Sequence, residues 1–310
     1  MYLSLLLNSL LYFIFILLSM AFFTLLERKI LGYSQIRKGP NKVGIMGIPQ
    51  PLADAMKLLS KEMSTTLKLN ISPFIISPFL ALFLSLLLWI LYPSMFSIQF
   101  LNLGLIMFLC ISSFNVYTIL AAGWASNSKY SLLGTLRSMA QSISYEISMS
   151  LIILGLIFMI LNFNFNLMNL YMSYMLMIMI FPSFIIWFMT TLAESNRTPF
   201  DLTEGESELV SGFNTEYSSG LFTLIFMAEY MNILFLSLLT SLFFIMNIKI
   251  MILNSMFLSL KIIFFSFFFL LIRATLPRMR YDCLMSLTWK CFLPYSLLLL
   301  ILLSSFIFNM

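Results

Sequence analysis

Acidic side chains that could carry protons are concentrated in one short segment of this chain. Between Leu192 and Tyr217 lie six of its 12 Asp and Glu residues, with Arg197 as the single base. The six acids are Glu194, Asp201, Glu204, Glu206, Glu208 and Glu216. Carboxylates packed close together repel one another and lose solvation, so some of their pKa values rise and they titrate as a group. Such a cluster would hold and transfer protons near neutral pH.

An acidic run is also compatible with an ordinary solvated loop. Here five apolar residues are interleaved with the acids: Phe200, Leu202, Leu209, Val210 and Phe213. This pattern favours packing over full solvation. Thr203 and Glu206 have the spacing of a capping box that opens a short helix, which gives Glu206 a structural alternative. Glu204 and Glu208 would then repel each other on one face of that helix.

The composition indicates the class of protein that contains these acids. Apolar residues make up 61% of the chain and charged residues 9%, and the mean hydropathy is +1.01. A soluble domain carries about 25% charged residues. The strands of a membrane barrel would alternate polar and apolar residues, and runs such as FFSFFFLLI do not. The sequence therefore predicts an all-α polytopic membrane protein without a sizeable soluble domain.

Stretches with no charge or a single charge predict eight spanning helices, each of about 20 residues or more. The expected spans in a single membrane domain, 1–310, are approximately 3–26, 70–91, 98–121, 140–161, 171–192, 219–246, 252–273 and 288–308. The loops expected on one side are 27–68, 123–137, 193–216 and 274–287. With the last loop widened to 273–290, they hold 15 of the 17 Lys and Arg residues. The positive-inside rule makes this the inner side and puts both termini outside.

Residues 48–62 of the first loop predict a helix that lies along the membrane surface. Leu52, Met56 and Leu59 would form its apolar face, with Pro51 in the first turn. The same pattern fits a simple interfacial anchor.

Two acids are expected inside spans. Glu146 follows Arg137 by nine residues and Glu229 follows Tyr217 by 12, so they lie roughly 13 and 18 Å along their helices. Acids at such depth in a layer about 30 Å thick are costly and are functional candidates, although a hydrogen-bonded structural carboxyl is the alternative. Lys261 is a weaker candidate, and we expect its side chain to snorkel to the outer interface.

Ligands for metals and redox groups are scarce. The chain has no His, and its three Cys residues, at 110, 283 and 291, have no metal-ligand spacing. Haem, zinc and iron–sulfur sites draw on His or Cys, and no glycine pattern fits a dinucleotide loop. We expect no metal site and no redox centre in this chain. The net charge of +5 is scattered over short loops, so it does not indicate nucleic-acid binding.

Six segments together resemble one family. They are LLERKILGYSQIRKGPNKVG (25–44), QPLADAMKLLSKE (50–62), GWASNSKYSLLGTLRSMAQSISYE (123–146), AESNRTPFDLTEGESELVSGFNTEY (193–217), MAEY (227–230) and RATLPRMRYDCLM (273–285). In order and spacing they resemble the subunit 1 family of NADH:ubiquinone oxidoreductase, respiratory complex I, in its mitochondrial form. The resemblance covers nearly the whole chain; Cys283 stands where Gln is usual.

The resemblance implies a multi-pass subunit of the mitochondrial inner membrane, with both termini on the intermembrane-space side. It would form most of the tunnel through which ubiquinone, the substrate, enters among the first span, the surface helix and the sixth span. The chain would belong to an enzyme but would not be catalytic alone, and flavin, haem and iron–sulfur clusters would lie elsewhere. Implied partners are matrix-arm quinone-site subunits, antiporter-like membrane subunits and lipids.

The resemblance also assigns residues. The tunnel and junction charges of the family fall on Glu27, Arg28, Arg37, Arg197, Asp201, Arg273 and Arg278. Its acidic proton relay falls on Glu146, Glu194, Glu204, Glu206 and Glu229. On sequence alone, Arg28, Arg37, Arg273 and Arg278 are equally compatible with charges that only set orientation.

Other classes stay open from the residues themselves. An ion transporter would explain the buried acids, but it should show paired helix breaks from inverted repeats. Pro73, Pro78 and Pro182 lie near span ends, and no repeat is evident. A membrane anchor subunit of a related hydrogenase-type complex would share the acidic loop without a quinone. A purely structural anchor would explain the loops but not Glu146 and Glu229.

Overall fold

Helices make up every regular element of the described chain. The computed structural model describes residues 2–66, 68–93, 101–171, 176–203, 205, 209–247 and 251–308. The elements are α1 (Tyr2–Ser34), α2 (Gln50–Ser60), α3 (Ile71–Trp89), α4 (Gly104–Ser126), α5 (Lys129–Ile160), α6 (Phe165–Tyr171), α7 (Leu176–Met179), α8 (Phe181–Glu194), η1 (Gly212–Asn214), α10 (Ser219–Phe244), α11 (Met251–Thr275), α12 (Tyr281–Leu287), η2 (Thr288–Phe292) and α13 (Leu293–Phe308). The predicted all-α class is confirmed.

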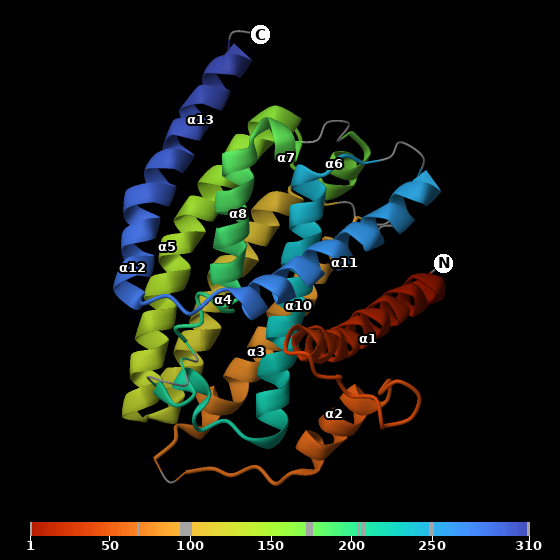
Figure 1. Ribbon diagram of the computed structural model, residues 1–310, viewed down its shortest axis with the longest axis vertical. Helices are drawn as coiled ribbons and strands as arrows, with labels where there is room; N and C mark the ends of the chain where they lie inside the picture. The colour runs from red at the N-terminus through yellow and green to blue at the C-terminus, as the bar shows by residue number, and fades with distance from the viewer. Residues whose placement is uncertain are drawn as a thin grey trace.

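The long helices form a bundle with α10 near its centre (Figure 1). Helix α10 packs on α3 and α11, α3 packs on α4, and α4 packs on α5. Helices α8 and α13 both contact α5, and α1 lies against α10, α11 and α2. In Figure 1, α1 and α11 run obliquely to α3, α4 and α5. This arrangement places the segment between α8 and α10 next to α4 and α5, because η1 contacts both helices.

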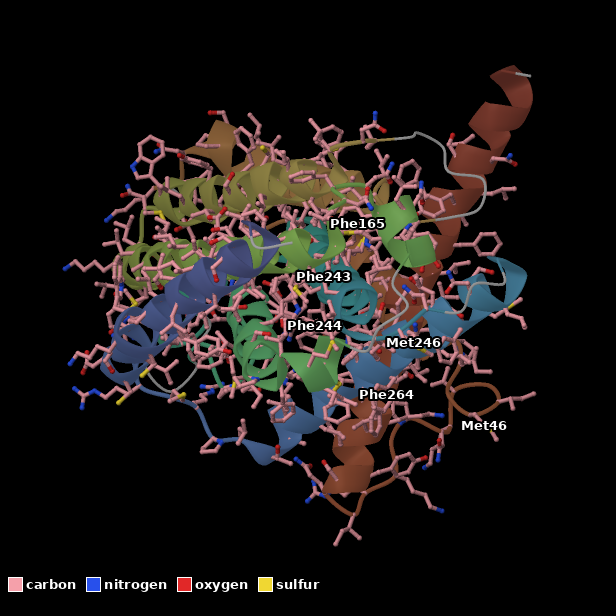
Figure 2. All side chains as sticks on the ribbon, turned by 90° about the horizontal axis from the view of Figure 1, so that it is seen from above. Met46, Phe165, Phe243, Phe244, Met246 and Phe264 are labelled. Atoms are coloured by element: carbon pink, nitrogen blue, oxygen red, sulfur yellow. The ribbon has the colours of Figure 1, made fainter. Side chains whose placement is uncertain are left out.

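Aromatic side chains fill the middle of the bundle. Phe165, Phe243 and Phe244 lie between helices in Figure 2, and each is at most 3% exposed. Met46 and Phe264 lie at the periphery in the same view and are more than half exposed. In the best spanning window of α10, 61% of residues are buried, against 17% in that of α1. Burial thus identifies α10 as the central helix and leaves the outer apolar surfaces to lipid or partner chains.

Seven helices of the described residues are long and apolar enough to cross a membrane. The region expected to provide the remaining span, 171–192, includes residues that the structure does not describe and is otherwise divided into α7 and α8. The division falls at Ile180, and Pro182 opens α8, as suits a residue whose own N–H is missing. At 14 residues, α8 is roughly 21 Å long. The count of eight spans therefore stays a prediction.

Helices extend into two of the expected loops. Helix α1 continues to Ser34, and the segment expected as a loop over 123–137 is mostly helix, because α4 ends at Ser126 and α5 begins at Lys129. Only two residues turn the chain: Asn127 is left-handed, with φ 48°, and Ser128 is extended. Asn tolerates this conformation better than most residues. The loop was expected because Lys129 and Arg137 are charged, but these charges lie in the first turns of α5 instead.

The helix predicted within 48–62 is present as α2, with proline in its first turn. Its apolar residues Leu52, Met56 and Leu59 are each about 60% exposed or more. On the other side, Asp54 accepts hydrogen bonds from Arg28 at 2.5 Å and from Gln50 at 3.0 Å. Helix α2 is therefore tied to α1 by polar contacts, with its apolar face free for a membrane surface or a partner.

The expected snorkelling of Lys261 is wrong. Its side chain is 5% exposed and donates hydrogen bonds of 2.6 Å to the carbonyl oxygen of Met246 and to Oδ1 of Asn247. The ammonium also lies 4.5 Å from the ring centroid of Phe257. The segment after α10 supplies oxygen acceptors within reach of Lys261, so its charge is satisfied inside the protein.

We expect Gly123→Ala to destabilise the fold. A Cβ at Gly123 would lie 1.8 Å from Cγ2 of Thr135, so the Thr135 side chain would have to move or α4 and α5 would have to separate. Overpacking of this kind costs about 1–3 kcal/mol. The measurement is the thermal unfolding midpoint of the purified protein in detergent. As a control, Gly220→Ala meets no atom closer than 3.8 Å and should leave the midpoint unchanged; equal midpoints for both variants would contradict the expected close approach.

Candidate functional site

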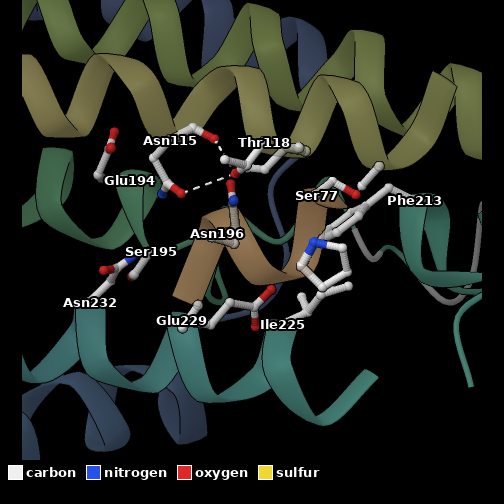
Figure 3. A pocket seen from close by; sticks show the side chains of 15 residues that line it. Ser77, Asn115, Thr118, Glu194, Ser195, Asn196, Phe213, Ile225, Glu229 and Asn232 are labelled. Atoms are coloured by element: carbon white, nitrogen blue, oxygen red, sulfur yellow. Dashed lines mark hydrogen bonds between the residues drawn. The ribbon is translucent and has the colours of Figure 1, made fainter. Parts of the chain in front are cut away.

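A polar cavity lies between α3, α4, α10 and the C-terminal end of α8. Its volume is about 40 Å³, and about 10–15 Å³ suffices for one water molecule. Figure 3 shows side chains from these helices converging on it. Its polar lining residues are Ser77, Asn115, Thr118, Glu194, Ser195, Asn196, Glu229 and Asn232. Two carboxyl groups therefore share a partly open cavity with room for a few waters.

Glu194, the last residue of α8, is enclosed by protein. Its Oε2 atom is buried and has no hydrogen-bond partner among the described residues. Burial and, to a smaller extent, the nearby charge of Glu146 on α5 together raise the pKa of the Glu194 carboxyl to about 8. At neutral pH the carboxyl is therefore mostly protonated, and a small change in its surroundings would ionise it. It lies just beyond the expected span 171–192, at the C-terminal end of α8.

Gln141 fixes the backbone around Glu194. Its Nε2 atom donates hydrogen bonds of 2.9 Å to the carbonyl oxygens of Ala193 and Phe200, and Gln141 is itself fully buried. Asn196 continues the turn with a φ of 50°. These contacts join the chain on both sides of Arg197 to α5, so Glu194 and Arg197 are held on a rigid turn rather than on a free loop.

Arg197 connects the loop to Glu229 on α10. The Nη2 atom of Arg197 lies 3.5 Å from Oε2 of Glu229, and both side chains are less than one-fifth exposed. The guanidinium carbon lies 4.7 Å from the centroid of the Tyr230 ring, a cation–π distance. Glu229 also lines the polar cavity, so Arg197 is connected to that cavity through its ion pair with Glu229.

A second charged group adjoins Arg197 on its other side. A small cavity of about 10 Å³ is lined by Phe23, Glu27, Arg197 and Arg273, with apolar residues of α10 and α11. Arg273 pairs with the buried carboxylate of Glu27. Arg197 thus stands between the Glu27–Arg273 pair and Glu229, and it links two groups of charges from α1, α10 and α11.

Asp201 joins the acidic segment to the turn after α11. Its Oδ2 lies 3.2 Å from Nη2 of Arg278, and the backbone N–H of Met279 donates to the carbonyl oxygen of Pro199 at 3.0 Å. Segments some 80 residues apart in sequence are therefore held together at one end of the bundle.

The remaining sequence-predicted residues are placed differently. Arg28 pairs with Asp54, and Arg37 is exposed; neither lines the cavities above. Glu146 is half-buried on α5 and acts on Glu194 through its charge. Glu204, Glu206 and Glu208, with the capping box proposed for Thr203 and Glu206, lie outside the described residues. Their roles stay predictions.

Amide and hydroxyl side chains were missed by the sequence analysis. Asn115 and Asn232 line the polar cavity beside the two acids, and Thr118 donates to Oδ1 of Asn115 at 3.2 Å (Figure 3). A signal existed for Asn232, because it follows Glu229 by three residues and so shares its helix face. For Asn115 the signal was an amide in the charge-free stretch 69–128.

Among the described residues, no group of three or more His, Cys, Asp or Glu is arranged to hold a metal ion. The expected lack of a metal or redox centre stays a prediction. What the described side chains offer is proton chemistry: an enclosed protonated acid, an ion-paired acid and space for water between them.

Comparison with known proteins gives the family. A protein-family model described as NADH dehydrogenase matches residues 7–304. The NADH-ubiquinone oxidoreductase chain 1 of Aedes aegypti is 54% identical over 297 residues, which is 96% of this chain and 94% of that protein. Proteins of the same name from Heterololigo bleekeri and Osphranter rufus are 48% and 49% identical, each over 94% of this chain and over 95% and 93% of their own lengths. With a match this long and identities near one half, the chain belongs to the NADH dehydrogenase family.

Proposed function

We propose that this chain is a membrane subunit of a mitochondrial NADH:ubiquinone oxidoreductase that forms the ubiquinone access tunnel and couples quinone reduction to proton translocation. The family match and the names of its relatives support the assignment as a subunit of this enzyme. The proposed tunnel and the proposed coupling rest above all on the enclosed carboxyl of Glu194, which shares a cavity with Glu229.

The arrangement of α1, α2 and α10 supports a tunnel for an apolar tail. These three helices contact one another in pairs, and the Glu27–Arg273 pair and Arg197 lie beside α1 and α10. Apolar walls suit a polyisoprenoid tail, and charged groups at the inner end suit the polar headgroup. In this proposal the headgroup's hydrogen-bonding partners belong to neighbouring matrix-arm subunits, and Asp201 with Arg278 shapes the junction to them.

The charges support a relay from the tunnel to the cavity. Reduction of the quinone takes up two electrons and two protons, so negative charge arises near the tunnel's inner end. At about 10 Å and an effective dielectric constant of about 20, one unit charge is worth roughly 1.7 kcal/mol, a little over one pKa unit. Glu194, with a pKa raised to about 8, is poised to change protonation under such a field.

In the relay, Arg197 transmits the change. It contacts Glu229 on one side and lines the small cavity with Glu27 and Arg273 on the other. A new negative charge near Arg197 weakens its hold on Glu229, which favours protonation of Glu229 from the waters of the polar cavity. Glu194 and then Glu146 follow by the same coupling, with Glu204 and Glu206 proposed as the supply on the inner side.

The placement of the chain follows from the same proposal. The acidic segment and basic loops face the matrix, and both termini face the intermembrane space. Protons leave Glu146 and Glu194 toward antiporter-like membrane subunits, and the exposed apolar helix surfaces meet those subunits or lipid.

Replacing Glu194 with Gln should uncouple the enzyme. Proton transfer by a positioned acid contributes about 10²–10⁴-fold, so proton pumping during NADH oxidation should fall about tenfold or more. The measurement is the proton-to-electron ratio of the assembled complex in vesicles. Glu62→Gln makes the same chemical change at an exposed position and should pump normally. Full pumping by both Glu194→Gln and Glu229→Gln would remove these residues from the relay.

A protonated carboxyl at Glu194 should be visible by infrared difference spectroscopy. Burial raises its pKa to about 8, so the proton is bound below that pH and leaves as the pH rises through it. We expect a carboxylic-acid C=O band that is present at pH 6, half lost near pH 8 and missing in Glu194→Gln. A band that titrates in the ordinary range of an exposed Glu, about 4.3, would contradict the enclosure of this residue.

A further inference from the structure

Three cavities lie in a row along the interface of α3 and α4. The polar cavity described above is followed by a second of about 20 Å³, and the two share Asn115, Glu194 and Asn232 in their linings. A third, of about 10 Å³, lies at the other end of these helices, where Leu91, just after α3, and Gly104 of α4 meet Asn164 and Asn166. The row passes from the inner end of the bundle to its outer end.

The second cavity changes character along its length. Near Glu194 it is lined by polar side chains, including Ser85, Ser112 and Asn115. Its far end is formed by Leu88, Phe108 and Phe235, which are 7%, 2% and 1% exposed. Water in the part of the cavity near Glu194 would therefore be bounded by the apolar side chains of Leu88, Phe108 and Phe235.

The apolar side chains at the far end of the second cavity are tightly packed. The rings of Phe108 and Phe235 lie 5.8 Å apart between centroids, and Trp89 contacts Phe235 edge-on at 6.0 Å. Trp89 is fixed in turn, because its Nε1 donates to the carbonyl oxygen of Met231 on α10 at 3.3 Å. Leu105, fully buried, lies one turn from Phe108 on the way to Gly104. Phe108 to Gly104 is four residues, roughly 6 Å along α4.

We propose that Leu88, Phe108 and Phe235 form an apolar seal that stops protons from crossing the membrane through this chain. An apolar constriction excludes water and so breaks a chain of hydrogen bonds, and an ion without solvation or a partner does not cross it at a useful rate. The inference goes beyond the proposed relay and rests on it only for its purpose: a proton held at Glu194 is released sideways, not outward. The seal itself can be measured without turnover.

Phe108→Asn should open the seal. The assembled complex is reconstituted into vesicles containing a pH-sensitive dye, and a potassium diffusion potential is imposed with valinomycin in the absence of NADH. Passive proton influx should rise about tenfold or more over the unsubstituted complex, which corresponds to a barrier lower by about 1.4 kcal/mol. Phe108→Leu keeps the site apolar and should stay tight. Phe114→Asn makes the same exchange on the exposed face of α4, where Phe114 is 59% exposed. Vesicles with this variant should also hold the proton gradient.

A second pair of variants separates the seal from general damage. Leu88→Asn removes the α3 part of the seal and should also allow protons to leak. If Phe108→Asn fails to assemble, Leu88→Asn alone tests the seal. Adding Ser112→Leu to Phe108→Asn fills the second cavity and should restore tightness, which would not follow if packing were merely loosened. Assembled Phe108→Asn and Leu88→Asn complexes that hold the gradient as well as Phe108→Leu would overturn the inference. A leak in these variants, together with normal pumping by both Glu194→Gln and Glu229→Gln, would keep the seal and reject the relay.

Discussion

An ionised side chain in apolar surroundings is stable only beside an opposite charge, and otherwise it becomes neutral. This chain uses both solutions within one small region. Glu229 and Glu27 are paired with Arg197 and Arg273, whereas Glu194 has a buried oxygen without a partner among the described residues and a pKa raised to about 8. A paired acid and an enclosed protonated acid that share one cavity have different proton affinities, and in the proposed relay a change in the field at Arg197 alters the balance between them.

Hydropathy was enough to predict the class of fold and most helices, because a spanning helix is a local property of some 20 residues. Depth within a helix likewise follows from counting, and so Glu146 and Glu229 were identified as buried candidates. The hydrogen-bonding partners of a side chain, in contrast, depend on tertiary structure. The acceptors of Lys261, on Met246 and Asn247, are brought to it only because the segment after α10 folds back, so the sequence indicated snorkelling instead. The same holds for Arg28 and Asp54, which meet only because α2 returns to α1.

The cavity could not be predicted for a related reason. Asn115 reads as an isolated polar residue in a charge-free stretch, and nothing in the sequence pairs it with Glu194, which is 79 positions away. Only the packing of α4 against α3, and of α10 against α3, brings them to one space. The break at Ile180 was also not predicted. Pro182 was expected near a span end, but it stands in the middle of the expected span 171–192, where the surrounding apolar run conceals the break from a hydropathy criterion.

Helix α10 changes from polar to apolar side chains along a single stripe that faces the cavities. Residues at spacings of three and four face the cavities in order: Ile225, Ala228, Glu229, Asn232, Phe235 and Leu236. Such spacings keep side chains on one face of a helix. From the acid Glu229 through the amide Asn232 to Phe235 is six residues, roughly 9 Å. Since water needs polar partners to stay in a cavity of this size, the order of these side chains determines where hydration ends and, in the proposed relay, how far a proton from the inner side can travel.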